Sequence, residues 1–279
     1  MDPHFRAFSF VDRITSVNGG NQIRGCYTIP ASLKDFPSSL AGEAVGQLAA
    51  WAAMAAGNFE NRPVAGLAGS IELLESPVAG QVLELAADLE HVDAESVQYR
   101  GAACLNGKVV IRLEDCVGPM VPVADFDDPN SLRNRYKLLC GNGAEPGAFP
   151  GLPPLKFERT EGERGQTISA IFPVPPDAPL FADHFPRRPV FPGSLLMHLK
   201  IQLGAALASE LPPPARGHWT VDRIQDMKLR SFIPPGAILR LDAKLKECAN
   251  DSASISLEAR AGQDLIATAG LALKTSSVE

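Results

Sequence analysis

The residue of this sequence best placed for chemistry is a histidine in a proline-rich loop. His184 lies within Phe181–Gly193 (FADHFPRRPVFPG), and an apolar helix is expected to begin at Gly193. Three prolines restrict the backbone around the histidine, and Gly193 lets a ligand approach the unpaired amides at the helix start. A general base and an oxyanion site would therefore lie side by side. A loop histidine hydrogen-bonded to backbone is the structural alternative.

A carboxylic acid on an apolar helix is the second candidate. Between Leu40 and Ala56 the only polar side chains are Glu43 and Gln47. A helix that is apolar all round is a buried one, and an ionised Glu43 would need partners there. Gln47 is four residues further on, so it shares a face with Glu43 and can position the carboxyl group. We expect Glu43 to be catalytic in a cleft; exposure near the helix start and a structural pair are the alternatives.

The elements that must position these residues form an internal repeat. Residues 43–50 align with 198–205 at an offset of 155, and residues 78–89 align with 234–245 at an offset of 156. Each half is therefore expected to contain a helix followed by a strand meander. Period-2 patterns predict half-buried antiparallel strands at 81–89, 97–105, 108–114, 220–230, 237–247, 253–260 and 264–273. The Pro-, Gly- and Asp-rich stretch 119–156 is expected to connect the halves, with a short helix at 131–139.

Composition excludes several classes of function. The chain has 279 residues, 45% of them apolar, and a net charge of −6, which argues against general nucleic-acid binding. It has no apolar run long enough to span a bilayer, and its N-terminus lacks the profile of a signal peptide, so we expect a cytoplasmic protein without membrane insertion. Five cysteines without a C-x-x-C pair favour reduced, packed thiols. No zinc-ligand spacing or G-x-S-x-G motif occurs, so we expect no metal.

The loop and helix resemble the hotdog-fold 3-hydroxyacyl carrier-protein dehydratases of fatty-acid and polyketide synthesis, the FabA/FabZ type. The pattern of that family is H-F-P-x-x-P-x-x-P-G, then a helix with Glu or Asp and then Gln, and His184–Gly193 matches its loop. Phe8–Ile14 resembles the opening strand, and Met227–Gly236 resembles the strand and turn after the helix. The resemblance implies an α+β double hotdog, a pseudo-dimer of two long helices each wrapped by antiparallel sheet. The domains would be 1–125 (supplying the acid), 126–153 (a linker) and 154–279 (supplying the His-Phe-Pro loop).

Two departures from the family pattern are complementary. The position of the family's acid, fourteen residues after His184, is occupied here by His198, and Asp35 stands where the first half should have its histidine. His198 by itself is better explained as a core histidine than as a catalytic one. Family sites combine the histidine of one hotdog with the acid of its partner, so the resemblance implies that His184 meets Glu43. The other composite site, with Asp35 and His198, is expected to be inactive.

The resemblance also implies a mechanism, the dehydration of 3-hydroxyacyl thioesters to trans-2-enoyl thioesters. His184 would remove the C2 proton, the Gly193 amide would hold the thioester carbonyl, and Glu43, kept protonated by burial, would protonate the departing hydroxyl. Gln47 would orient Glu43. Further substrate-binding residues would be Phe185, Phe191, Pro192 and Ser194. No metal or redox cofactor is implied, since the substrate would arrive on the phosphopantetheine of acyl carrier protein or as a CoA thioester.

Other surfaces and other functions follow from the same resemblance. Candidates for a patch that docks an acidic carrier protein are Arg187, Arg188, Lys200, Arg216, Lys228 and Arg230; the alternative is that they are solvated surface cations without a partner role. Small residues expected to leave room for an acyl tunnel are Gly46, Ala49, Ala50, Gly204 and Ala205. Free sheet edges would let pseudo-dimers associate into a homo-oligomer. The alternatives are an enoyl-CoA hydratase of the same fold, a non-catalytic acyl-binding or scaffold protein, and, with less support, a thioesterase.

Overall fold

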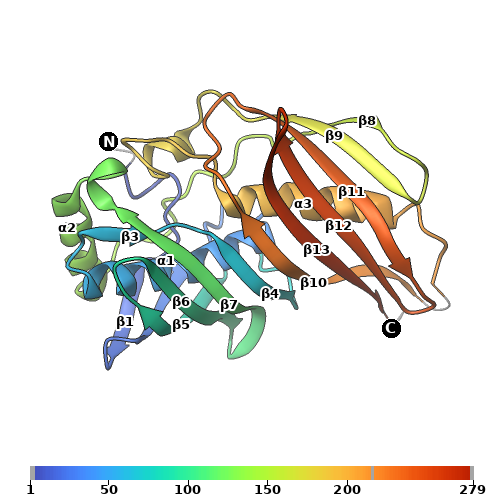
Figure 1. The fold of residues 1–279 in the computed structure, drawn as a ribbon. Coiled ribbons are helices and arrows are strands. Elements are labelled where there is room, and N and C mark those ends of the chain that lie inside the picture. The colour runs from blue at the N-terminus through green and yellow to red at the C-terminus, as the bar shows by residue number, and fades with distance from the viewer. Residues whose placement is uncertain (1–3, 215–216, 277–279) are drawn as a thin grey trace.

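Two helices, each wrapped by strands of one antiparallel sheet, form the body of the molecule (Figure 1). The computed structural model describes residues 4–214 and 217–276. The first half comprises β1 (Arg13–Asn18), β2 (Gln22–Thr28), α1 (Ser38–Ala56), β3 (Asn61–Pro63), β4 (Leu67–Leu73), β5 (Val82–Val92), β6 (Ser96–Leu105) and β7 (Lys108–Pro122). The connection carries η1 (Val123–Asp125) and α2 (Pro129–Cys140). The second half comprises β8 (Glu158–Glu161), β9 (Thr167–Pro173), η2 (Pro179–Ala182), α3 (Gly193–Ala208), β10 (His218–Leu229), β11 (Ile238–Cys248), β12 (Ser252–Ala261) and β13 (Asp264–Ser276).

The boundaries of these elements confirm the repeat. Helix α1 begins at residue 38 and α3 at residue 193, an offset of 155. Strands β5, β6 and β7 begin at residues 82, 96 and 108, and β11, β12 and β13 begin at 238, 252 and 264, an offset of 156 in each case. Proline also precedes both helices, as Pro37 and Pro192 at the two N-cap positions. Equivalent segments of the two halves therefore fold into equivalent elements.

A single sheet joins the halves. Its strand order is β1-β2-β5-β6-β7-β4-β10-β13-β12-β11-β9-β8, with β3 paired to β7 beside this path. The junction is the antiparallel pair β4 and β10, in which Glu72 lies opposite Arg223 and Leu67 lies opposite Lys228. Figure 1 shows α1 on the side of the first half and α3 on the side of the second. Such an architecture is a double hotdog, as the resemblance implied.

The core of each half is the helix face that packs on the sheet. In α1, Leu40, Val45 and Leu48 are fully buried, and in α3 the same holds for Leu199 and Leu203. Alanine and leucine favour the helix, while alternating apolar residues in β5 and β11 place one face of each strand inside. Within the described residues, no helix has both the length and the hydrophobicity that a bilayer crossing requires.

The structure confirms the expected short helix and corrects two expectations about the strands. Strand β7 continues to Pro122 rather than ending near residue 114, so it occupies part of the expected connection. The short helix is present as α2, with the Asp128 carboxylate accepting a hydrogen bond of 2.7 Å from the Ser131 amide as its N-cap. Strands β2, β4 and β9 were not among the predicted ones. Glycine or serine in each of them weakens the period-2 signal, and pairing with a neighbouring strand decides their conformation.

Candidate active site

The His184 loop is fixed by its own backbone. The His184 amide donates to the Leu180 carbonyl at 2.8 Å, and the Val190 amide donates to the His184 carbonyl at 3.1 Å. The imidazole Nδ1 lies 2.8 Å from the Val190 carbonyl oxygen. A carbonyl can only accept, so Nδ1 carries the proton and Nε2 is left with its lone pair. The loop therefore presents His184 as the tautomer that a general base requires.

Glu43 and Gln47 lie on one face of α1, as their spacing predicted. The Gln47 Nε2 donates to the Glu43 Oε1 at 2.9 Å and to the Phe8 carbonyl at 3.0 Å, while its Oε1 accepts from the Phe10 amide at 2.8 Å. All the hydrogen bonds of the amide group thus serve to hold Glu43 and the N-terminal segment. The four-residue spacing predicted this contact between Gln47 and Glu43.

That N-terminal segment, residues 5–10, also reaches the histidine loop. It forms no strand, so the resemblance of Phe8–Ile14 to an opening strand holds only from Arg13, where β1 begins. The Asp183 carboxylate accepts hydrogen bonds from the Phe8 amide at 2.8 Å, the Ser9 hydroxyl at 3.0 Å and the Phe5 amide. The edge of the Phe8 ring meets His184, with ring centroids 5.5 Å apart. Asp183 precedes His184 directly in the chain. Residues 5–10, called the strap below, therefore connect Gln47 of the first half to the His184 loop of the second half. No motif or periodic pattern in the sequence indicates this connection.

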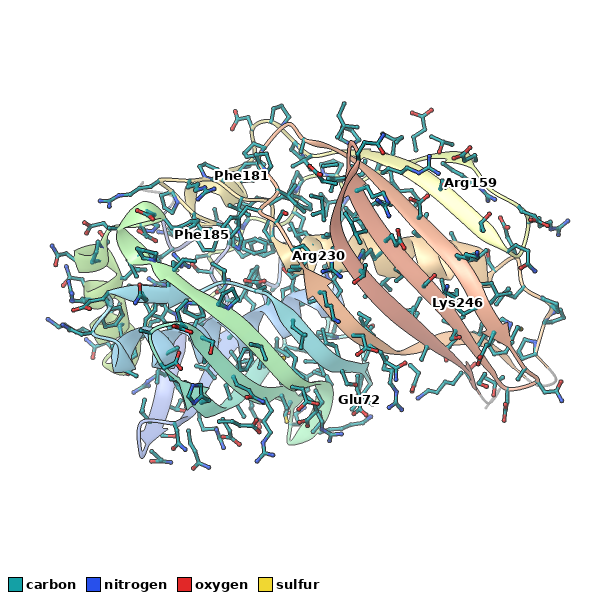
Figure 2. The ribbon with its side chains drawn as sticks, in the orientation of Figure 1. Glu72, Arg159, Phe181, Phe185, Arg230 and Lys246 are labelled. Atoms are coloured by element: carbon teal, nitrogen blue, oxygen red, sulfur yellow. The ribbon has the colours of Figure 1, made fainter. Side chains whose placement is uncertain are left out.

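One cavity of about 410 Å³ collects the candidate groups of both halves. A volume of this size is typical of small-molecule sites. Glu43, Gln47 and His184 all line the cavity. Gly193, predicted for the oxyanion site, lines it too, as do the predicted substrate-binding residues Phe185, Phe191 and Ser194. Pro192 does not, because it stands at the N-cap of α3 with its neighbours turned toward the space. Figure 2 shows Phe185 on the loop leading to α3 and Arg230 at the end of β10, near the junction of the halves.

The start of α3 offers hydrogen-bond donors to this cavity. The amides of Leu195 and Leu196 both donate to the Pro192 carbonyl, at 3.1 Å each, whereas those of Gly193 and Ser194 have no acceptor among the described residues. The Ser194 hydroxyl is buried and also lacks a partner in the described chain. With the positive end of the helix dipole, these groups suit an oxygen that gains negative charge.

Close packing is a second reason for glycine at position 193. A Cβ added to Gly193 would lie 2.4 Å from Cδ1 of Leu229 and 3.9 Å from Cβ of Ala65. Leu229 ends β10, and Ala65 leads into β4. The helix start is therefore wedged against the two strands that join the halves, which holds its amides in place.

Burial controls the protonation of His184. Removal from water lowers the pKa of His184, with Glu43 as the largest opposing influence and the Val190 carbonyl next; the nearby Arg62 charge acts in the same direction as burial. A lowered pKa keeps the imidazole neutral at pH 7. Burial raises the pKa of Asp183, and its hydrogen bonds to the strap partly offset that rise. His184 is thus a neutral imidazole that lines the same cavity as Glu43.

Arg62 and Tyr99 are among the polar cavity residues that were not predicted from the sequence. Arg62 on β3 lies with its Cζ 4.0 Å from the centroid of the Phe185 ring, and burial lowers its pKa to about 10. Tyr99 on β6 faces α1, since a Cβ on Gly46 would lie 3.3 Å from the tyrosine hydroxyl. Burial raises the pKa of Tyr99 well above its ordinary value and that of the adjacent Cys116 to about 12. Arg62 and Tyr99 lie on strands whose sequence pattern does not indicate that they line a cavity.

Of the two long helices, α1 lines the cavity along most of its length, whereas α3 contributes only its first turns. Along α1 the cavity is lined by Gly42, Glu43, Gly46, Gln47, Ala50, Trp51 and Met54. This face spans about 18 Å at 1.5 Å per residue. Gly46 and Ala50 were predicted to line a tunnel, but Ala49 is buried in the core instead. Gly204 and Ala205 do not line the cavity either, and a Cβ on Gly204 would lie 2.4 Å from Leu271, so that glycine serves helix-to-sheet packing.

The second composite site is not formed. Asp35 is exposed, and His198 is half-buried on α3, with its pKa lowered by burial alone. In the part of the chain that the structure describes, no hydrogen bond, ion pair or pocket links the two side chains. The loop before α1 is shorter than the His184 loop, and Asp35 lies on the protein surface. His198 was favoured as a core histidine, but it is only half-buried and is not part of the buried core.

The predicted docking cations are only partly on the surface. Arg187, Arg188, Lys228 and Arg230 are exposed, and Arg216 lies outside the described residues. Lys200, in contrast, is 3% exposed, because it lies on the face of α3 that packs on the sheet. The prediction for Lys200 is wrong, because Lys200 is the repeat equivalent of Val45, a core position of α1. Among the described residues, no three His, Cys, Asp or Glu side chains gather in a way that could hold a metal ion.

The fold and site together define a double hotdog with a His- and Glu-lined cavity between its halves, and known proteins agree with this class. Residues 159–269 match the family of ApeI-like dehydratases. A 3-hydroxyacyl-[acyl-carrier-protein] dehydratase FabZ from Paracidovorax citrulli is 36% identical over 97 residues, which are 33% of this chain and 66% of the relative. The FabZ of Desulforamulus reducens is 29% identical over 111 residues, 40% of this chain and 78% of the relative.

Solved structures match nearly the whole chain. A MaoC-like dehydratase superposes with a TM-score of 0.51 at 13% identity, covering 92% of this chain and 98% of the other. The 12:0-ACP thioesterase from Umbellularia californica gives a TM-score of 0.56 at 7% identity, covering 91% and 94%. These likenesses show the fold, and the sequence matches confirm the resemblance to FabA/FabZ-type hotdog dehydratases. The family match covers the half with His184 and leaves out the half with Glu43.

Proposed function

We propose that this protein dehydrates 3-hydroxyacyl thioesters to trans-2-enoyl thioesters in one composite site per chain. The observation that carries the proposal is the shared cavity, in which Glu43 of α1 and His184 of the loop before α3 face the free amides of Gly193 and Ser194. Support also comes from the matches to ApeI-like dehydratases and to FabZ. The remaining half of the molecule supplies the acid and the space for the acyl chain.

In the proposed reaction His184 acts first on the substrate carbon. Its neutral Nε2 takes the proton from C2, and the electron pair of that bond forms the C2=C3 double bond. As the thioester oxygen gains enolate character, the Gly193 and Ser194 amides stabilise it; one such donor contributes on the order of 3 kcal/mol where water is excluded. The Val190 carbonyl holds the imidazolium that results, through Nδ1.

Glu43 acts on the leaving group. The C3–O bond breaks, and the oxygen takes the proton of the Glu43 carboxyl group to leave as water. The Gln47 amide, held by Phe8 and Phe10, keeps that carboxyl group in one orientation. The substrate would be carried on phosphopantetheine, without a metal or redox cofactor. Exposed Arg187, Arg188 and Arg230 near the junction would favour an acidic carrier protein over CoA.

Conversion of a 3-hydroxyacyl thioester tests the proposal. The substrate is offered on acyl carrier protein and on N-acetylcysteamine to the wild type, His184→Ala and Glu43→Gln, with His198→Ala as the matched control. Loss of about a hundredfold or more in kcat is expected for the first two variants and little change for the control. A folded wild type that forms no enoyl product at any chain length would contradict the proposal and favour an acyl-binding or scaffold role.

Two further readouts separate the alternatives. Release of free thiol without enoyl product would indicate thioester hydrolysis, the activity named for several proteins of the same fold. Faster hydration of enoyl-CoA than dehydration of the carrier-bound substrate would indicate a hydratase that uses the same two residues in reverse. Equal loss in His184→Ala and His198→Ala would argue against a site assembled across the halves.

A further inference from the structure

Arg62 is a charged side chain of the cavity that donates no hydrogen bond to any described residue. Its Nε and Nη1 are buried without a hydrogen-bond partner, and the whole side chain is 13% exposed. Nη1 lies 3.7 Å from Oδ2 of Asp127, close enough for an ion pair but too long for a hydrogen bond. Buried polar groups without partners are rare in folded proteins, and a ligand is one reason for them.

The surroundings of Arg62 leave its N–H groups available. The guanidinium lies over the Phe185 ring at 4.0 Å, and the Phe185 ring in turn stacks on the His184 imidazole with centroids 4.2 Å apart. Stacking fixes the plane of a guanidinium without using its donors. Arg62 also stands opposite Val121 in the pairing of β3 with β7, so its backbone is fixed as well. The side chain is therefore held rigidly with its donors unspent.

The Arg62 charge acts on both members of the proposed dyad. Its pKa of about 10 keeps it a cation at pH 7, and Asp127 and then Glu43 oppose the effect of burial on it. The same charge influences His184. Three carboxyl groups, those of Glu43, Asp127 and Asp183, already line this cavity. A further anionic group on the substrate would meet them, so a neutral oxygen that gains charge only during the reaction suits Arg62 better.

We propose that Arg62 is a third catalytic residue, which donates a hydrogen bond to the oxygen on C3 and stabilises the negative charge that develops there as the C3–O bond breaks. The inference rests on the proposed function and adds a cation to its acid and base. Arg62 gives up no proton: the C2 proton goes to His184, the oxygen takes its proton from Glu43, and water leaves. The cation acts only in the transition state, where charge accumulates on that oxygen.

A reaction that lacks the C3 oxygen separates Arg62 from His184. A saturated acyl thioester of the same length can exchange its C2 hydrogen with deuterium from solvent, which requires His184 and the α3 amides but no leaving group. The test compares dehydration and C2 exchange in the wild type, Arg62→Met, Arg62→Lys and His184→Ala. Arg133→Met is the matched control, because Arg133 also lies over a phenylalanine ring, that of Phe59, but outside the cavity.

The expected results differ by variant. Arg62→Met should lose about 100-fold in kcat for dehydration and keep C2 exchange within about threefold of wild type. Arg62→Lys, which keeps the charge with fewer donors, should lose about tenfold in dehydration only. His184→Ala should lose both reactions, and Arg133→Met neither. The inhibition constant of the saturated thioester, measured against dehydration, should be unchanged in both Arg62 variants because the contact is absent from that ligand.

Other outcomes overturn one proposal or the other. Unchanged dehydration in Arg62→Met, or equal loss of dehydration and exchange, would refute the role of Arg62 and leave the proposed function standing. A wild type that performs neither reaction would refute the proposed function itself. If Arg62→Met does not fold, as its thermal unfolding would reveal, Arg62→Lys decides by the same comparison.

Discussion

A buried lysine in α3 gives the sharpest stability prediction. Lys200 is 3% exposed, and its Nζ has no hydrogen-bond partner among the described residues. Burial lowers its pKa from 10.5 to about 7, with only Glu258 opposing that effect. Its side chain borders a narrow apolar space with Leu196, Ile224 and Leu257. We predict that Lys200→Met, which keeps the length of the side chain and removes the amine, stabilises the fold.

The size of the effect depends on pH. Between pH 7 and pH 10.5 the unfolded chain binds a proton at Lys200 that the folded chain does not, so this group makes wild-type stability rise with pH. Below pH 7 both states are protonated and the penalty is complete. The difference between 10.5 and about 7, at about 1.36 kcal/mol per pKa unit, gives about 5 kcal/mol as an upper bound. Local relaxation reduces it, so we expect a gain of about 2–5 kcal/mol at pH 7.

Guanidinium chloride unfolding of both proteins at pH 6.5, 7, 8 and 9 measures this difference. The advantage of Lys200→Met should shrink by about 1.4 kcal/mol per pH unit above pH 7. Lys246→Met is the control, because Lys246 is an exposed lysine on β11 and should show no such trend (Figure 2). An advantage that stays constant from pH 7 to pH 9, or a variant less stable at every pH, would refute the reasoning that the ammonium group is buried unpaired.

Three further predictions concern the site. Gly193→Ala should lower the unfolding free energy by about 1–3 kcal/mol and remove much of the activity, because the added Cβ would lie 2.4 Å from Leu229. Thermal stability and turnover should recover in the double variant Gly193→Ala, Leu229→Ala, and no recovery would contradict the packing argument. Gln47→Met should lower kcat by about tenfold and speed hydrogen exchange at the Phe10 amide, because both depend on the Gln47 side chain; unchanged exchange would argue against the strap. The acid limb of the pH profile of kcat/KM should have its midpoint below pH 6.5, because burial lowers the pKa of His184. The same shift makes the contribution of His184 to stability complete above pH 6.5 and lost as the pH falls toward the folded-state pKa. A kcat/KM midpoint above pH 6.5, or one that is the same in His184→Ala, would count against this assignment.

Much of the architecture could be predicted from the sequence because the repeat is strong. Two matching offsets, 155 for the helix and 156 for the strands, predicted equivalent halves whose element boundaries the structure reproduces. The candidate pair was predictable for a local reason: His184 belongs to a proline-rich loop, and Glu43 is the only acidic residue of an apolar helix. Both signals depend on residues close together in the chain.

What could not be predicted depends on contacts between distant segments. Arg62 enters the cavity because β3 pairs with the end of β7, and β3 is a three-residue strand without a pattern of its own. Asp183 is tied to a strap that lies more than 170 residues away in the chain. Lys200 was taken for a surface cation because the period of α3 is obscured by apolar residues on all sides, so its charge said nothing about its direction.

The one-sided cavity gives a physical reason why the two halves differ. The cavity runs along Gly42, Gly46 and Ala50 of α1. The equivalent face of α3, at the repeat offset of 155, carries the larger side chains of Met197 and Ile201, which border a narrow space of only about 10 Å³. Because the cavity runs beside α1, a catalytic histidine is useful only where it faces that cavity. The loop of the second half, which carries His184, is in that position. A histidine restored at position 35 would have neither a tunnel nor an acid on α3. We therefore expect Asp35→His with His198→Glu to remain without a second active site: titration with a tight inhibitor should still give one site per chain, and two sites would refute the argument that the closed face of α3 is decisive.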